Sequence, residues 1–209
     1  NRIYTLYNQS GASTATRMSQ YRKSTQEQMK NVYGTKSKNL SIDEKFMPLK
    51  SDLIRVQLEM LYPFYVENPW TRYLKGKKVL VVHPFAETIQ NQYARREKLF
   101  PDNPDILPEF ELKVLKAVQT LGYEDPNFKD WFEALDYMKK EIDKVDYDVC
   151  LLGCGAYGFP LAAHCKRHGK QAIHLGGILQ LLFGIKGKRW ETDPGYINDF
   201  PYASTYYKE

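Results

Sequence analysis

Three glycines at a fixed spacing are the first residues in this chain that could do chemistry. They form a G-x-G-x-x-G pattern directly after an apolar run and directly before a stretch of helical character. At such a turn, backbone N–H groups can approach an anion, and the dipole of the following helix favours negative charge there. The pattern predicts contact with a phosphate or diphosphate, and a tight strand-to-helix turn without a ligand is the alternative. The predicted ligand-binding residues of the turn are Gly153, Gly155, Ala156, Tyr157 and Gly158.

Nicotinamide and flavin dinucleotides are not expected as cofactors. A dinucleotide site requires an acidic residue about 20 positions after the glycine turn, where it holds the ribose hydroxyls. The strand at that distance ends His174-Leu175-Gly176-Gly177, without a carboxylate. The turn also follows a late strand rather than the first one.

Polar groups at the start of another helix are candidates for catalysis. His83 ends the first predicted strand, and Glu87 begins the helix that follows. An imidazole there can bind a phosphate or a sugar hydroxyl, and a carboxylate can act as a general base. Alternatively, the Glu87 carboxylate has no catalytic role and only stabilises the helix through the positive end of its dipole.

The last predicted strand and the segment after it add further binding candidates. By topology they are expected at the same edge of the sheet as the first two turns. The basic side chains among them could neutralise a diphosphate leaving group, although a solvated loop is the alternative. The candidates are His174, Gly176, Gly177, Gln180, Lys186 and Arg189.

No metal-binding residues are predicted. Asp146-Tyr147-Asp148 matches the D-x-D pattern of many metal sites. It precedes a strand, however, whereas ligands of open α/β sheets bind outside the carboxyl ends of the strands. We interpret it as a solvated strand entrance. The cysteine spacings are not those of a zinc site, and His164 and His168 stand beside Arg and Lys on a helix. A divalent cofactor, Mn²⁺ or Mg²⁺, remains open.

Alternating strands and helices are predicted to position these groups. Apolar runs at 78–82 and 149–152 are typical of buried parallel strands, and a further strand is expected at 171–175. Residues 110–118 are an extended candidate for which a helix remains open. Helices are expected at 85–99, 127–142 and 159–168. In the second of these, the apolar face is expected to contain Phe128, Trp131, Phe132, Leu135, Met138 and Ile142. The prediction is an α/β fold, a Rossmann-like parallel sheet flanked by helices.

Composition predicts one main domain with extensions. Residues 1–62 are polar and form a mainly helical or irregular N-terminal arm, 63–195 form the ligand-binding domain, and 196–209 form a Tyr-rich tail. The chain of 209 residues can bury a core, and its net charge of +5 is modest and does not require nucleic acid. No apolar run approaches the roughly 20 residues of a membrane span. Three cysteines and no secretion signal favour the cytoplasm.

Several stretches resemble a family of bacterial polysaccharide-biosynthesis proteins related to the GT-D-type glycosyltransferases. They are KGKKVLVVHPF at 75–85, DWFEAL at 130–135, GAYGFPLA at 155–162, KQAIHLGG at 170–177 and FGIKGKRW at 183–190. The resemblance covers about 62–190. It implies a Rossmann-like protein that binds a nucleoside diphosphate sugar donor and a glycan acceptor, as a transferase or as a non-catalytic module beside a partner enzyme. The Arg-x-Gly-x-x-Glu signature of such transferases has no match near the start of this sequence, so it lies upstream or is lost.

Overall fold

The computed structural model describes residues 61–119, 127–187 and 207–208. Apart from residues 61 and 62, they belong to one compact unit, which comprises Pro63–Gly187 and Ser204–Glu209. Almost all of the predicted N-terminal arm and most of the Tyr-rich tail therefore lie outside the described residues. Within the described part, no helix is both long and apolar enough to cross a membrane.

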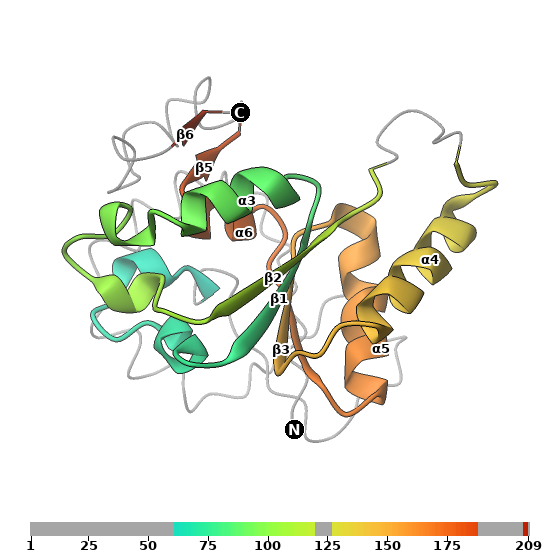
Figure 1. The fold of residues 1–209 in the computed structure, drawn as a ribbon, viewed down its shortest axis with the longest axis horizontal. Helices are drawn as coiled ribbons and strands as arrows, with labels where there is room; N and C mark the ends of the chain where they lie inside the picture. The colour runs from blue at the N-terminus through green and yellow to red at the C-terminus, as the bar shows by residue number, and fades with distance from the viewer. Residues whose placement is uncertain (1–60, 120–126, 188–206, 209) are drawn as a thin grey trace, which may run out of the picture. The chain divides into compact units, whose positions relative to one another are not determined.

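A four-stranded parallel sheet forms the centre of the unit (Figure 1). Its strands are β1 (Lys78–His83), β2 (Glu111–Lys116), β3 (Val149–Leu152) and β4 (Gln171–His174), in the order β2-β1-β3-β4. All neighbours pair in parallel. The predicted Rossmann-like α/β fold is confirmed, and the extended alternative at 110–118 is the correct one.

The two central strands are the most deeply buried. Val79, Leu80, Val81 and Val82 have 0% exposure, and every residue of β3 is buried. Such continuous apolar runs suit strands that are covered on both faces. The edge strand β2 alternates charged and apolar residues and is only partly buried.

Helices cover both faces of the sheet (Figure 1). α3 (Ala86–Tyr93) and α6 (Ile178–Leu182) lie on one face, and α4 (Trp131–Asp143) and α5 (Gly158–Arg167) lie on the other. The remaining short elements are β5 (Ile185–Lys186), β6 (Tyr207–Lys208) and the 3-10 helices at Pro63–Tyr65, Trp70–Leu74, Arg96–Lys98, Pro104–Ile106 and Gly155–Tyr157. β5 and β6 pair in parallel as a separate two-stranded sheet.

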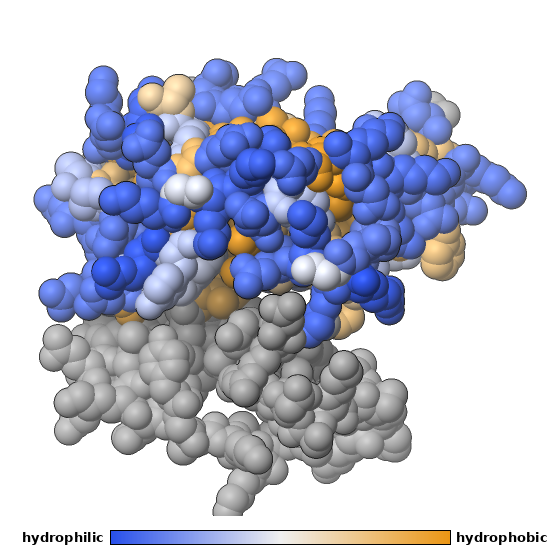
Figure 2. Space-filling view, turned by 60° about the horizontal axis from the view of Figure 1, so that its bottom comes forward, coloured by the Kyte–Doolittle hydropathy of each residue, from blue (hydrophilic) through white to orange (hydrophobic). Residues whose placement is uncertain are grey.

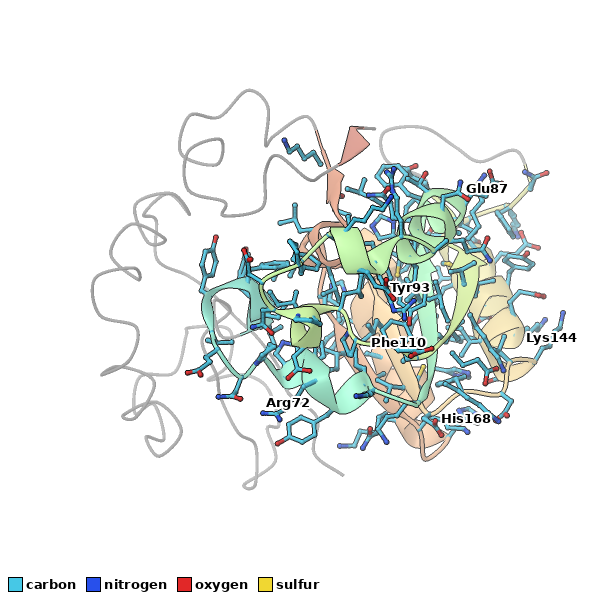
Figure 3. All side chains as sticks on the ribbon, turned by 60° about the vertical axis from the view of Figure 1, so that its left-hand side comes forward. Arg72, Glu87, Tyr93, Phe110, Lys144 and His168 are labelled. Atoms are coloured by element: carbon cyan, nitrogen blue, oxygen red, sulfur yellow. The ribbon has the colours of Figure 1, made fainter. Side chains whose placement is uncertain are left out.

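The helix predicted at 85–99 is shorter in the structure, because tertiary contacts end it at Tyr93. The buried amide of Gln92 donates to the carbonyls of Phe183 and Gly184, at 3.2 and 3.0 Å. The Tyr93 ring stacks on Phe110, with centroids 4.5 Å apart. Both residues are labelled in Figure 3. These contacts fix the last turn of α3 against distant segments, and the chain continues as a separate 3-10 helix.

α4 begins with a side-chain cap. The Asp130 carboxylate accepts a hydrogen bond from the Glu133 N–H at 2.9 Å, and the Glu133 carboxylate accepts one from the Lys129 N–H at 2.5 Å. The first bond satisfies an N–H group that the first turn of a helix leaves without a partner, and the second connects Glu133 to the residue before the cap. The sequence D-x-x-E therefore sets where α4 starts, four residues later than predicted.

Replacing Asp130 by Ala should destabilise the fold by about 1 kcal/mol, because the Glu133 N–H loses its acceptor. The expected decrease in melting temperature is about 2–4 °C. Lys140→Ala is a matched control on an exposed position of the same helix and should have almost no effect. Equal melting temperatures for Asp130→Ala and the wild type would show that the cap does not contribute.

One expectation for the apolar face of α4 is wrong. Phe132 is 69% exposed, whereas Ala134, Leu135, Met138 and Ile142 are buried. Phe132 lies next to Trp131 in sequence and faces outward, since neighbouring positions of a helix point in different directions. The three cysteines are free and buried.

Candidate functional site

The glycine turn lies at the topological switch point of the sheet. β3 neighbours β1, and the chain leaves β1 toward β2 on one side but leaves β3 toward β4 on the other. In open α/β sheets, ligands bind outside the carboxyl ends of strands at such a point. The turn comes late in the sequence, yet it emerges at the centre of the sheet beside the end of β1.

The tip of the turn presents two backbone donors. Within the turn, the Tyr157 N–H donates to Cys154 and the Gly158 N–H donates to Gly155. In the described part of the chain, the N–H groups of Gly155 and Ala156 have no hydrogen-bond partner, and both residues are exposed. They precede α5, whose dipole favours an anion at this end. Gly155 has φ +56°, which favours glycine.

The other two glycines of the pattern are explained by packing. A Cβ on Gly153 would lie 2.6 Å from the His83 ring and 3.0 Å from the Gly176 carbonyl oxygen. A Cβ on Gly158 would lie 2.0 Å from Nδ1 of His174. Both glycines therefore allow a histidine ring to pack against the backbone, whether or not a ligand binds.

The two histidines lie on opposite faces of the sheet. Gly153, which packs on His83, also packs on Leu179 of α6, so this histidine lies on the α3 and α6 face. Gly158, which packs on His174, belongs to α5 on the other face. The two imidazoles share the carboxyl edge, as predicted, but they are separated by β3.

His83 is a buried neutral imidazole. It is 3% exposed, and its Nδ1 accepts a hydrogen bond from the Phe85 N–H at 3.1 Å. Burial lowers its pKa to about 4. Because Nδ1 is the acceptor, the ring proton is on Nε2, and this histidine can offer a ligand a neutral N–H donor.

His174 has the opposite tautomer. Its Nδ1 lies 3.2 Å from the Leu152 carbonyl oxygen, which can only accept, so Nδ1 carries the proton and Nε2 carries the lone pair. Burial lowers its pKa, and the hydrogen bond to Leu152 partly opposes this. The edge of the sheet thus has one neutral donor on one face and one neutral acceptor on the other.

The Tyr157 side chain belongs to the core rather than to a ligand surface. It is buried and stacks on Trp131 of α4, with ring centroids 5.0 Å apart and planes 9° from parallel. This stack holds the start of α4 against the glycine turn. In consequence, two exposed aromatic side chains lie close to the turn, Phe159 in the first turn of α5 and Phe132 beside Trp131.

Those aromatic side chains were missed as candidates from the sequence. Phe159 is 59% exposed and directly follows the glycine pattern. On the face seen in Figure 2, hydrophilic side chains cover most of the described surface and apolar ones appear in narrow strips. Exposed aromatic rings beside free backbone donors can stack on a sugar or a base.

The remaining predicted site residues are Glu87, Gln180, Lys186 and Arg189, and the three that the structure describes lie on separate elements. Glu87 is exposed in the first turn of α3, at the opposite end of the fold from His168 in Figure 3. The Gln180 amide donates to the Ile185 carbonyl oxygen at 3.4 Å, which ties it into the turn after α6. Lys186 lies in β5, and Arg189 lies outside the described residues.

Gly176 and Gly177 lie at the end of β4. The Gly176 N–H donates to the Leu152 carbonyl oxygen at 3.3 Å, which brings this turn against the end of β3. Gly176 has φ +57° and open space where a side chain would project. The backbone of this turn therefore borders Gly153 at the carboxyl edge.

The D-x-D pair lies at the other edge. Asp148 accepts a hydrogen bond from the Lys78 N–H at 2.8 Å, and Asp146 forms an ion pair with the Lys78 ammonium at 2.5 Å. Both carboxylates are exposed and engaged at the start of β1. The ion pair lowers the pKa of Asp146. This arrangement agrees with the interpretation of the pair as a solvated strand entrance.

Comparisons with known proteins give no relative for this chain: no protein-family model, no curated protein and no solved structure matches it.

Proposed function

We propose that the chain binds a nucleoside diphosphate sugar at the glycine turn and is a glycosyltransferase-like protein of surface polysaccharide biosynthesis. The observation that carries the proposal is the pair of free N–H groups at Gly155 and Ala156, at the start of α5 and at the switch point of the sheet. Two adjacent donors at a positively polarised helix start are suited to a diphosphate. The biological process, surface polysaccharide biosynthesis, is proposed from the family resemblance in the stretches 75–85, 130–135, 155–162, 170–177 and 183–190.

The surroundings of the turn support a sugar nucleotide rather than a free phosphate. The exposed rings of Phe132 and Phe159 offer stacking surfaces for a base or a sugar. The Nε2–H of His83 and the Nε2 lone pair of His174 provide one donor and one acceptor at the same edge. A phosphate alone would need none of these groups.

A second candidate is a non-catalytic module that binds the nucleotide sugar and acts with a partner enzyme. It is favoured by the positions of the carboxylates. The D-x-D pair is held at the amino-terminal edge, and the predicted base, Glu87, is exposed in the first turn of α3 with no hydrogen bond to either histidine of the site. Both candidate functions require binding of the nucleotide sugar, but only the transferase also transfers the sugar to an acceptor.

Binding is tested first by calorimetric titration with UDP and with a panel of nucleoside diphosphate sugars. Gly155→Leu should weaken binding at least about tenfold, because it adds bulk and backbone strain at an exposed φ +56° position that itself carries one of the two donors. Gly169→Leu is the matched control: its φ is +74°, no atom lies within 4 Å of its Cβ position, and it follows α5 at the other end. It carries similar backbone strain and should bind as the wild type does.

The outcomes separate the candidates. Binding that is lost only in Gly155→Leu supports the ligand site, and release of the nucleotide diphosphate from a bound donor then favours a transferase over a binding module. Equal loss in both glycine variants would assign the effect to strain. No binding of any nucleotide would leave the turn as a strand-to-helix connection and refute the proposal.

A further inference from the structure

Three side chains that can bind a metal meet at the amino-terminal edge of the sheet, away from the glycine turn. Asp143 is the last residue of α4, and His164 and His168 lie in and just after the last turn of α5. The Nε2 of His164 lies 2.7 Å from Oδ1 of Asp143. One ligand atom of each residue lies within 4.8 Å of the other two.

Helix geometry explains the meeting of the two imidazoles. His164 and His168 are four residues apart, so they lie on the same face of α5, and their ring centroids are 4.3 Å apart. The packing of α4 against α5 brings the carboxylate of Asp143 to that face. Two histidines at i and i+4 with a third ligand from another element is a common metal-binding arrangement.

The second imidazole is already oriented. The Nδ1 of His168 lies 3.0 Å from the carbonyl oxygen of His164, which can only accept a hydrogen bond, so Nδ1 carries the proton. Its Nε2 is left with the lone pair that a metal requires. A hydrogen bond from the other ring nitrogen to a carbonyl is the usual support for a metal-bound histidine.

The neighbouring lysine side chains form their ion pairs and hydrogen bonds with groups other than the carboxylate of Asp143. Lys139 pairs with Asp136 at 2.8 Å, and Lys144 pairs with Glu141 at 2.5 Å. Lys170 donates to a backbone carbonyl. Among the described residues, the Asp143 carboxylate makes a polar contact only with the His164 ring, and the Asp143 side chain is 44% exposed, so a metal ion can reach it from solvent.

We propose that Asp143, His164 and His168 bind a divalent transition metal such as Zn²⁺, which fastens the end of α4 to the end of α5. Two imidazole nitrogens and one carboxylate oxygen suit Zn²⁺, Ni²⁺ or Cu²⁺ better than Mg²⁺, which prefers oxygen ligands alone. The metal replaces the proton that His164 and Asp143 share in their hydrogen bond. If the His164 ring is neutral before binding, its proton moves from Nε2 to Nδ1. If the ring is protonated, the Nε2 proton is released to solvent. Water completes the coordination of the metal.

This metal does not belong to the nucleotide site. Both helices end where the chain enters β3 and β4, whereas the glycine turn follows the opposite end of β3. A metal bound here stabilises the fold and takes no part in a transfer step. Metal effects on nucleotide binding should therefore be measured in a variant that lacks this site.

The test is calorimetric titration of the full chain, without an affinity tag, with ZnCl₂ in a buffer that does not chelate metals. Saturable binding of one ion per chain is expected, and about 100-fold excess over Kd should raise the melting temperature by about 5–10 °C. His168→Ala and Asp143→Asn should each weaken binding at least about tenfold. Both positions are exposed, so the folded state should tolerate these changes.

Arg167→Ala is the matched control, since it is exposed on the same turn of α5 and offers no metal ligand. It should bind Zn²⁺ as the wild type does. Three results would overturn the proposal: no saturable binding, unchanged affinity in His168→Ala and Asp143→Asn, or an equal loss in Arg167→Ala. Zinc binding and nucleotide binding are measured separately, so failure of one proposal leaves the other intact.

Discussion

Gly158→Ala is expected to lower the free energy of unfolding by about 3 kcal/mol, from overpacking and a weakened hydrogen bond. The new Cβ would lie 2.0 Å from Nδ1 and 2.2 Å from Cε1 of the His174 ring. That ring cannot move freely, because its Nδ1–H is bonded to the Leu152 carbonyl oxygen. Either α5 shifts away from the sheet or the hydrogen bond breaks. Urea unfolding followed by circular dichroism measures the loss.

A double-mutant cycle identifies the clash as the cause. In a His174→Ala background the ring is gone, so Gly158→Ala should change stability by less than about 0.5 kcal/mol. Its effect there can even be favourable, since alanine is the better helix former. If Gly158→Ala destabilises both backgrounds equally, the contact with His174 is not the reason for a glycine at this position.

Much of the sheet could be predicted from the sequence, because burial on both faces gives β1 and β3 continuous apolar runs. The end of α5 lies within one residue of the predicted position, and Gly169, with φ +74°, follows it as glycine commonly does at a helix end. The end of α3 was not predicted correctly, because it depends on contacts of Gln92 and Tyr93 with segments distant in sequence. Helical periodicity does not report such contacts.

The sequence predicts which residue types make up the candidate site, but it does not predict how they are arranged. Residues two apart in a strand share a face of the sheet. The register between two strands, however, cannot be read from the sequence of either strand alone. His174 pairs with Leu152, whereas His83 packs against Gly153, the next residue of the chain. That offset of one residue places the two histidines on opposite faces.

The pairing of Asp143 with His164 was missed for a similar reason. The two residues are 21 positions apart and meet only because α4 packs on α5. In the sequence, His164 and His168 are surrounded by Lys and Arg, which argued against a metal. The structure shows Lys139 and Lys144 engaged with other carboxylates.

The stability of the fold should decrease by about 3 kcal/mol as the pH falls from 6.5 to 4, through His83 alone. Burial lowers the pKa of this imidazole to about 4 in the folded chain, against about 6.5 in the unfolded chain. Between these values the unfolded chain binds the extra proton, so the stabilisation is complete above pH 6.5 and is lost as the pH approaches 4. His174, whose pKa is also lowered, acts in the same direction.

The contribution of His83 is isolated by comparing the wild type with His83→Leu over this pH range. Carboxylates titrate in both proteins, so the difference between the two stability curves reports the imidazole. Leucine removes the acceptor of the Phe85 N–H and lowers stability at pH 7, but it should flatten the slope below pH 6.5. Proton NMR of the ring in the wild type should show a titration midpoint near 4. A midpoint near 6.5, or parallel curves, would show that this histidine is not buried as a neutral group, and its role as an Nε2–H donor to a ligand at neutral pH would lose its basis.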